Sequence, residues 1–250
     1  MRDAIYVPVD IRQHVYSPTA KRTVRNRAVD INEQTAASLL LEVERAVQDK
    51  QKGGKWKVAY VWWSPECTTY TKADAVNRNR GAAYRDMRKK HRPPLRPADG
   101  GSQEKYRKAK AADRTLKVGL AIIKAWRRRW PNMKSAIENP AEGMRYQRAM
   151  QEWERSGYKR HKVEYCAYGH PYNKPTDIWT DLDWAPAGET GDGRCGQRCT
   201  QGERTQDGTW KHKRAIAQES DREVQGPGRQ EWKQLVPLAL HRELAEQVPR

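Results

Sequence analysis

The chain has 250 residues, of which 36% are apolar and none is phenylalanine, so it can form one α/β core of moderate size with extensive polar loops. Lys and Arg total 49 against 31 Asp and Glu, and the formal net charge of +18 favours a nucleic-acid partner. No apolar run approaches the roughly 18 residues of a membrane-spanning helix, and the four cysteines indicate no disulfide framework. These features argue against a membrane protein. They predict an intracellular one, cytoplasmic or nucleoid-associated in a bacterial or phage setting and nuclear in a eukaryote.

Two strand patterns and one helix pattern occupy the first fifty residues. Residues 4–10 and 28–31 are apolar runs that contain the acids Asp10 and Asp30. Apolar residues with helical spacing predict a helix over residues 35–50. An acid at a strand end can accept hydrogen bonds from a ligand, and it can equally be an ordinary turn residue.

Strands and helices continue to alternate along the chain. Residues 58–63 predict a buried strand, and residues 77–101 predict a basic, proline-containing loop or broken helix. A long helix with one apolar stripe is expected over residues 113–130, followed by a strand over 135–140. This alternation predicts an α/β fold with a mostly parallel, Rossmann-like sheet, helices on both faces and a small irregular C-terminal region.

Two of the expected strands end in residues that are capable of chemistry. Cys67 follows the first strand in the sequence Pro65-Glu66-Cys67, and Glu138-Asn139 ends the second. Strand ends in open α/β sheets face one crevice, so the thiol and the carboxylate are expected to share a site. Taken alone, Cys67 could be a small buried apolar residue, and Glu138 could be a helix N-cap or a surface acid.

In this order, the two segments resemble the cytosine-C5 DNA methyltransferases, in particular small phage-like and virus-like members. In that family a Pro-Cys turn supplies the nucleophile, and a Glu-Asn turn after the next strand holds the target base. A third similar segment runs from Tyr168 to Trp179, with Lys174 at the position of the family's first arginine. The resemblance covers roughly residues 5–180. It implies a methyltransferase sheet, DNA as the partner and S-adenosyl-L-methionine as the cofactor.

The resemblance implies a role for each matched residue. The Cys67 thiolate would add to carbon 6 of a flipped-out cytosine and push electron density onto carbon 5. Glu138 would bond to ring nitrogen 3 and stabilise the developing charge, Asn139 would position the base edge, and Lys174 would complete the catalytic set. Lys174 could also be an ordinary solvated lysine. The positions similar to the family's cofactor-binding residues are Asp10, Asp30 and Pro65.

The chain also departs from the family pattern. No Gly-x-Gly segment precedes the first expected strand, so we expect an N-terminally incomplete catalytic domain over residues 1–180. Glu66 replaces the family's usual proline, and a carboxylate so close is expected to raise the pKa of the Cys67 thiol. Residues 181–235 correspond to a short target-recognition region. Residues 236–250 are expected to form a C-terminal helix that packs back on the catalytic domain.

Two functions therefore remain in view. The first is a DNA cytosine-C5 methyltransferase, and the second is a non-catalytic DNA-binding relative that has lost its cofactor site. A zinc-dependent cytosine deaminase lacks support, because no His-x-Glu stands upstream of a Pro-Cys-x-x-Cys. RNA remains open as a substrate, since a basic loop and a pocket for a flipped base suit either polymer.

A basic block separates the cysteine and glutamate motifs. Residues 78–130 contain 18 Lys or Arg residues against four Asp or Glu residues. Such a block would attract phosphates and add salt-dependent affinity with little sequence information. It could equally be a solvated basic loop.

Four residues in the C-terminal part of the chain could bind zinc. Cys195 and Cys199 are separated by three residues, His212 follows, and Cys166 is available as a fourth ligand. The spacing is a weak signal for a zinc site. Incidental cysteines in polar loops are therefore the preferred interpretation.

Overall fold

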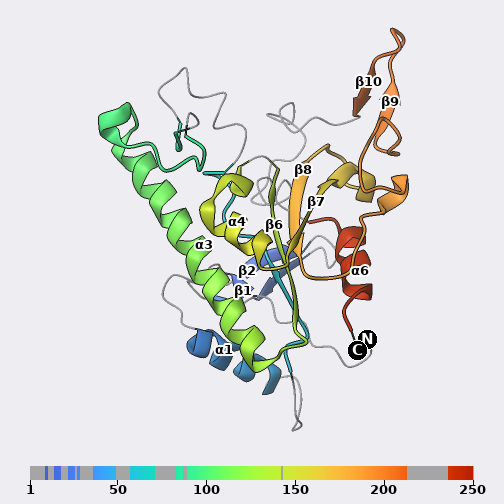
Figure 1. The fold of residues 1–250 in the computed structure, drawn as a ribbon. Coiled ribbons are helices and arrows are strands. Elements are labelled where there is room, and N and C mark those ends of the chain that lie inside the picture. Colours follow the sequence, from blue (N-terminus) through green and yellow to red (C-terminus); the bar gives the residue numbers. More distant parts are fainter. Residues whose placement is uncertain are drawn as a thin grey trace. The chain divides into compact units, whose positions relative to one another are not determined.

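The computed structural model describes residues 9–10, 14–17, 22–25, 27–28, 36–48, 57–70, 83–86, 89–141, 143–212 and 236–249. The chain divides into two compact units: the N-terminal unit, residues 1–59 and 113–133, and the sheet unit, residues 60–112 and 134–250. The strands are β1 (Val9–Asp10), β2 (His14–Ser17), β3 (Arg22–Arg25), β4 (Arg27–Ala28), β5 (Tyr60–Trp63), β6 (Lys134–Pro140), β7 (Lys159–Glu164), β8 (Pro175–Thr180), β9 (Gly202–Arg204) and β10 (Trp210–His212). The helices are α1 (Ala36–Gln48), α3 (Gln103–Arg129), α4 (Arg148–Arg155) and α6 (Leu238–Glu246), with short 3-10 helices η3 (Pro97–Asp99), η4 (Met144–Tyr146), η5 (Tyr165–Tyr168) and η6 (Gly188–Thr190) (Figure 1).

The N-terminal unit combines two small strand pairs with helical segments. Strands β1 and β4 pair in parallel, and β2 and β3 form an antiparallel pair. The helix predicted over residues 35–50 is confirmed as α1, which buries Leu39 and Leu40 and exposes Leu41. Residues 113–129 of α3 also belong to this unit. The predicted apolar stripe on α3 is confirmed by its buried side chains, which are Leu116, Leu120, Ile122, Ile123 and Trp126.

Helix α3 begins ten residues before the expected start. The Ser102 hydroxyl accepts a hydrogen bond from the backbone N–H of Lys105 at 3.2 Å, which is the geometry of a helix N-cap. The last turn contains Arg127, Arg128 and Arg129, whose charges suit a helix C-terminus, and Pro131 follows. The described residues of the predicted loop, 83–86 and 89–101, form turns, a 3-10 helix and an isolated bridge.

A four-stranded mixed sheet organises the sheet unit. Its strand order is β5-β6-β8-β7; β5 and β6 are parallel, whereas β8 is antiparallel to both β6 and β7. The α/β class is therefore confirmed, but a mostly parallel sheet is not. The cause is the connection from β7 to β8, residues 165–174, which is shorter than a parallel crossover needs.

Only β8 is reversed, however, and this determines where the strand ends lie. Because β8 is antiparallel to both of its neighbours, β5, β6 and β7 all run in one direction. The carboxyl ends of these three strands and the start of β8 therefore share one edge of the sheet. We call this edge the upper edge.

One apolar cluster anchors the C-terminal helix to the sheet. Leu240 and Leu244 of α6 are fully buried and pack with Ala136 of β6, Val163 of β7 and Ile178 of β8. Burying side chains of this size contributes roughly 1.5–3 kcal/mol each. Helix α6 is thus held against the sheet by its apolar face, as Figure 1 shows beside β7 and β8.

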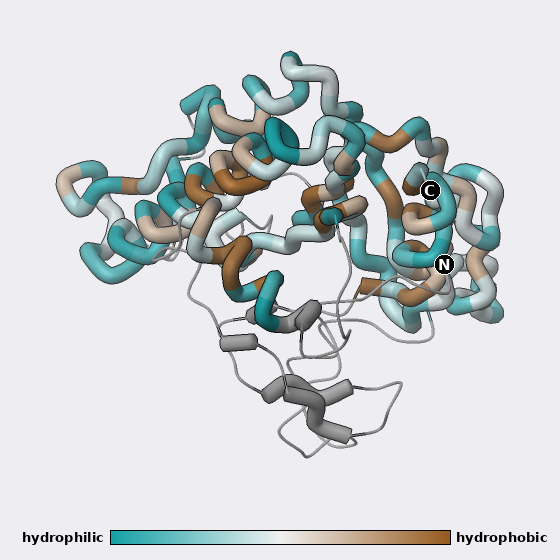
Figure 2. Tube along the Cα trace, turned by 90° about the horizontal axis from the view of Figure 1, so that it is seen from below, coloured by the Kyte–Doolittle hydropathy of each residue, from teal (hydrophilic) through white to brown (hydrophobic). Residues whose placement is uncertain are grey.

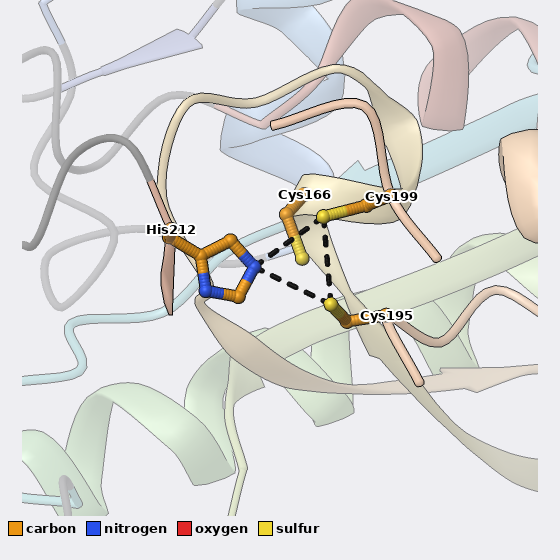
Figure 3. Close-up of side chains that lie close together, drawn as sticks. All are labelled: Cys166, Cys195, Cys199 and His212. Carbon is orange, nitrogen blue, oxygen red and sulfur yellow. Dashed lines mark hydrogen bonds between the residues drawn. The ribbon is translucent and has the colours of Figure 1, made fainter. Parts of the chain in front are cut away.

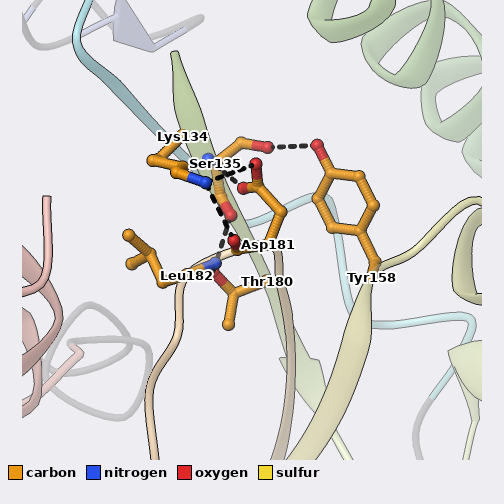
Figure 4. A network of polar contacts seen from close by, with 6 residues as sticks. All are labelled: Lys134, Ser135, Tyr158, Thr180, Asp181 and Leu182. Atoms are coloured by element: carbon orange, nitrogen blue, oxygen red, sulfur yellow. Dashed lines mark hydrogen bonds and ion pairs between the residues drawn. The ribbon is translucent and has the colours of Figure 1, made fainter. Parts of the chain in front are cut away.

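A polar network ties together the sheet edge opposite the upper edge (Figure 4). Asp181 accepts the backbone N–H of Ser135 at 2.8 Å, and its carboxylate lies 3.7 Å from the Lys134 ammonium group. The Ser135 hydroxyl lies 2.7 Å from the Tyr158 hydroxyl, and Thr180 donates to the Ser135 carbonyl at 2.8 Å. These bonds fix the register of β6 and β8, because they join the first two residues of β6 to the last residue of β8 and to Asp181, which follows it.

Hydropathy along the described trace follows the composition. Hydrophilic stretches dominate, and short apolar stretches interrupt them (Figure 2). Among the described residues, no helix combines the length and the apolar character that a membrane crossing requires.

Candidate active site

Cys67 lies in the tight turn that follows β5. The backbone N–H of Tyr70 donates to the Cys67 carbonyl at 2.9 Å and closes the turn. Pro65, Thr69 and Tyr70 are buried, whereas the Cys67 side chain is half-buried. The turn is therefore held on both sides of a thiol that keeps partial exposure.

A buried arginine that the sequence did not reveal supports this turn. The Arg85 guanidinium donates to the Thr69 carbonyl at 2.8 Å and to the Thr69 hydroxyl at 3.1 Å. It also lies 4.2 Å above the centre of the Tyr70 ring, a cation–π contact. Arg85 is only 2% exposed, so this arginine of the basic block supports the fold and is not solvated. Within that block, sequence pattern alone does not separate it from the solvated arginines.

The two motif segments bond directly to each other. The side-chain amide of Asn139, at the end of β6, donates to the Pro65 carbonyl at 3.1 Å. Asn139 is fully buried, and the described residues provide no hydrogen-bond partner for its side-chain oxygen. The prediction that the cysteine and glutamate motifs lie close together is therefore confirmed.

Gly143 provides a second contact between the motif loops. A β carbon at this position would lie 1.2 Å from the Tyr70 carbonyl oxygen, so only glycine permits the approach. Gly143 has an ordinary φ of −95°. Its requirement for glycine is therefore one of space, which single-sequence pattern does not show.

Glu138 is the centre of a polar cluster at the upper edge. The Tyr165 hydroxyl donates to Glu138 Oε1 at 2.8 Å, and Lys174 Nζ lies 3.8 Å from the same oxygen. Lys174 Nζ also lies 4.8 Å from the centre of the Tyr165 ring. Glu138 is 4% exposed and lies within β6, so it is neither a helix N-cap nor a surface acid. The Lys174 side chain is 13% exposed and is not an ordinary solvated lysine.

The charges of this cluster act on the thiol. Burial raises the pKa of Cys67; the positive charge of Lys174 lowers it, and the negative charges of Glu138 and, less strongly, Glu66 raise it. The net pKa is raised. The direction expected from Glu66 is confirmed, although burial is the larger cause.

Tyr165 is the residue of this cluster that sequence reasoning missed. It is fully buried at the start of η5, directly after β7. Burial first, and then the Glu138 carboxylate, raise its pKa well above the usual range, so the hydroxyl stays protonated and donates. The signal that could have found it is topological. Cys67 and Tyr165 follow strands that end at the upper edge, Lys174 precedes the strand that begins there, and Glu138 lies near the end of β6.

The expected cofactor residues are only partly described. Pro65 is buried, and its carbonyl is occupied by Asn139. Asp10 is the last residue of β1, with its side chain outside the described part, and Asp30 lies outside the described residues altogether. Their assignment to S-adenosyl-L-methionine stays a prediction.

The four residues that could bind zinc lie together in the sheet unit (Figure 3), although their spacing favoured incidental cysteines. The ligand atoms of Cys166, Cys195, Cys199 and His212 all lie within 4.8 Å of one another. The three cysteines are buried, and burial followed by the charges of the neighbouring thiols raises the pKa of Cys166. The structure thus brings together residues that span 47 positions of the sequence.

The described part of the basic block includes both paired and stacked side chains. Arg96 pairs with Asp99 at 2.8 Å, and Lys108 pairs with Glu104 at 2.7 Å. Arg92 stacks 3.5 Å from the centre of the Tyr146 ring. A DNA-facing role for the block stays a prediction.

No protein-family model matches the chain, and no curated protein or solved structure does either. The resemblance to the cytosine-C5 methyltransferases therefore rests on the motif residues of this sequence. The site described above adds the geometry of those residues.

Proposed function

We propose that the protein is a DNA cytosine-C5 methyltransferase with Cys67 as its nucleophile. The observation that carries the proposal is the direct bond between the two motif segments, from Asn139 to the Pro65 carbonyl. This bond brings the cysteine turn beside the Glu138 cluster at one sheet edge. The single reversed strand of the sheet is compatible with a Rossmann-like methyltransferase fold, which we also propose.

In the proposed reaction, each residue of the cluster has a distinct task. The Cys67 thiolate forms a bond to carbon 6 of a flipped-out cytosine, and the ring's electron pair moves toward carbon 5. Glu138, in the carboxylic-acid form that this step requires, donates a hydrogen bond to ring nitrogen 3 and stabilises the added negative charge, with its carboxyl group held by Tyr165 and Lys174. After methyl transfer, the proton on carbon 5 leaves to solvent and the bond from carbon 6 to Cys67 breaks, which restores the thiolate.

When bound, S-adenosyl-L-methionine supplies the electrophilic methyl group that carbon 5 accepts. Asp10, Asp30 and Pro65 are the residues proposed to hold it, on the sequence resemblance alone. The described residues give no independent test of that fit, because neither carboxylate is among the described side chains. The base-facing cluster therefore supports the proposal more directly than the cofactor residues do.

The test is transfer of a labelled methyl group to duplex DNA, with RNA as a parallel substrate. We expect transfer by the wild type and none by Cys67→Ser. DNA with fluorine in place of hydrogen at carbon 5 should trap a covalent adduct at Cys67, because carbon 5 then has no proton to lose. Glu138→Gln should slow trapping, whereas Glu66→Gln, at an exposed carboxylate, should preserve it. Transfer that persists in Cys67→Ser would overturn the proposal.

The raised pKa of Cys67 favours a second candidate, a non-catalytic DNA-binding protein with the same base-facing residues. A thiol that stays protonated at neutral pH is a poor nucleophile. Calorimetry separates the two functions. Binding of both DNA and S-adenosyl-L-methionine supports the enzyme, and binding of DNA alone supports the second candidate.

A further inference from the structure

We propose that Cys166, Cys195, Cys199 and His212 bind one structural Zn²⁺ ion, which clamps the glycine-rich segment of residues 188–212 to the end of β7. The proposal does not rest on the proposed methyltransferase activity. The sequence spacing favoured incidental cysteines, and the geometry reverses that preference.

The distances between the ligand atoms suit a tetrahedral ion. Cys195 Sγ and Cys199 Sγ are 3.4 Å apart, and His212 Nε2 lies 3.3 Å from the first sulfur and 3.4 Å from the second. Tetrahedral zinc with ordinary bond lengths separates two sulfurs by about 3.8 Å and a sulfur from a nitrogen by about 3.6 Å. Cys195, Cys199 and His212 would therefore move apart by only a few tenths of an ångström around the ion. The sulfur of Cys166 lies within 4.8 Å of the other ligand atoms and would complete the set.

The donor set is closed, as structural zinc sites are. Three thiols and one imidazole fill all four positions of a tetrahedron and leave none for water or substrate. Zinc prefers thiolate and imidazole ligands to the carboxylates that hold magnesium or calcium. These features point to a structural zinc ion rather than to a catalytic metal or a hard cation.

Each ligand is held by its own local structure. The turn between Cys195 and Cys199 has positive φ at Gly196 and Gln197, and Arg198 donates its N–H to the Cys195 carbonyl at 2.7 Å. This turn brings the two sulfurs to the same side. A left-handed conformation at Gln197 is unfavourable for a non-glycine residue, and bonds from both flanking cysteines to an ion would hold it.

The hairpin of β9 and β10 supplies the histidine. His212 pairs with Gly202, the third residue after Cys199. A β carbon at Gly202 would lie 2.4 Å from the Trp210 ring, and Trp210 packs against the three cysteines. Glycine at this position thus lets the indole cover the cluster and orient the strand that ends in His212.

Further bonds tie the cysteine loop to the same end of β7 that carries Cys166. The backbone N–H of Cys195 donates to Glu164 Oε2 at 2.7 Å, and the N–H of Glu164 donates to the Gly193 carbonyl at 2.8 Å. Cys166 directly follows Tyr165, which bonds to Glu138. An ion on Cys166 would therefore restrain the short helix η5, from which Tyr165 reaches the Glu138 cluster.

The experiment is metal analysis of the full chain, purified under reducing conditions without chelator. We expect about one zinc ion per chain in the wild type and in Cys67→Ser, the matched control at a cysteine outside the cluster. Cys199→Ser and His212→Ala should lose most of the zinc. The wild-type apo protein, titrated with Co²⁺, should show the absorption of a tetrahedral thiolate-bound ion. This measurement does not depend on whether a variant folds.

Three outcomes would overturn the proposal. The first is a wild type without stoichiometric zinc whose reduced apo form gives no tetrahedral cobalt spectrum. The second is zinc content that survives Cys199→Ser and His212→Ala, since the metal would then lie elsewhere. The third is a Cys195–Cys199 disulfide in protein kept reducing throughout, detected as a loss of two hydrogens by mass. None of these outcomes by itself overturns the methyltransferase proposal, so the two proposals fail separately.

Discussion

Replacing Gly143 with alanine should force apart the two loops that form the candidate active site. The added β carbon would lie 1.2 Å from the Tyr70 carbonyl oxygen and 2.2 Å from its carbonyl carbon. Both groups belong to backbone, so no side-chain rotation relieves the overlap. Ordinary contact requires the loops to separate by about 2 Å, given the close packing of protein interiors.

That separation has two measurable consequences. Overpacking of this kind costs roughly 1–3 kcal/mol, and a collision between backbones belongs at the upper limit of about 3 kcal/mol. In a chain of this size, the unfolding temperature should fall by about 6–12 °C. The bond from Asn139 to the Pro65 carbonyl, 3.1 Å long, would also be lost. Misplacing catalytic groups by about 1 Å can cost 100-fold in rate, so trapping of the fluorinated cytosine at Cys67 should slow by about that factor.

Gly157→Ala is the matched control. Gly157 has a φ of +103° and no atom within 4 Å of the added carbon, so alanine there meets backbone strain without collision. It should lower stability by about 1–2 kcal/mol and leave the chemistry of Cys67 unchanged. Calorimetric unfolding and the trapping rate are the two assays. If Gly143→Ala unfolds no lower than Gly157→Ala and traps DNA as fast as the wild type, the close approach of the loops is refuted.

Three further predictions concern charge and packing in the sheet unit. Because the pKa of Cys67 is raised, its alkylation by iodoacetamide should accelerate at a higher pH than that of an ordinary thiol. Lys174→Met should move the pH profile of alkylation to still higher pH, because it removes the positive charge that lowers this pKa. An unmoved profile would show that the charge of Lys174 does not act on Cys67. Leu240→Ala should lower the free energy of unfolding by about 2–5 kcal/mol, while Leu238→Ala, at a side chain 53% exposed on the same helix, should change it little; equal urea midpoints would contradict the packing of α6. Burial lowers the pKa of His241 to about 4, so its neutral form stabilises the fold above the unfolded pKa of about 6.5, and this contribution is lost as the pH falls toward 4. Between pH 7 and pH 5 the loss from His241 should be about 2 kcal/mol, and His241→Gln should show a correspondingly smaller change in urea midpoint.

The two clusters of the sheet unit are connected through one short helix. Tyr165 and Cys166 are consecutive residues of η5; the first bonds to Glu138, and the second belongs to the proposed zinc site. Metal removal is therefore expected to loosen the support of Glu138 without touching the Cys67 turn. Target recognition is the role predicted for residues 181–235, and the same ion would attach the described part of that region to the upper edge.

Local pattern determined several of the segments of this chain that become regular structure. The apolar runs before Cys67 and Glu138 predicted two strands, and helical spacing predicted most of α1 and α3. These predictions succeeded because the period of apolar residues depends only on neighbours in sequence. The order of the motifs likewise predicted that the thiol and the carboxylate would share a site.

The tertiary structure alone decided how those segments combine. The reversal of β8 brings Lys174 to the upper edge, and a long-range approach of backbones makes Gly143 necessary. Arg85 became a buried support only when Thr69 and Tyr70 closed around it. The cysteines and the histidine, uninformative in their spacing, converged into four potential ligands. Pairings of this kind depend on contacts between residues far apart in the chain, and local periodicity contains no record of them.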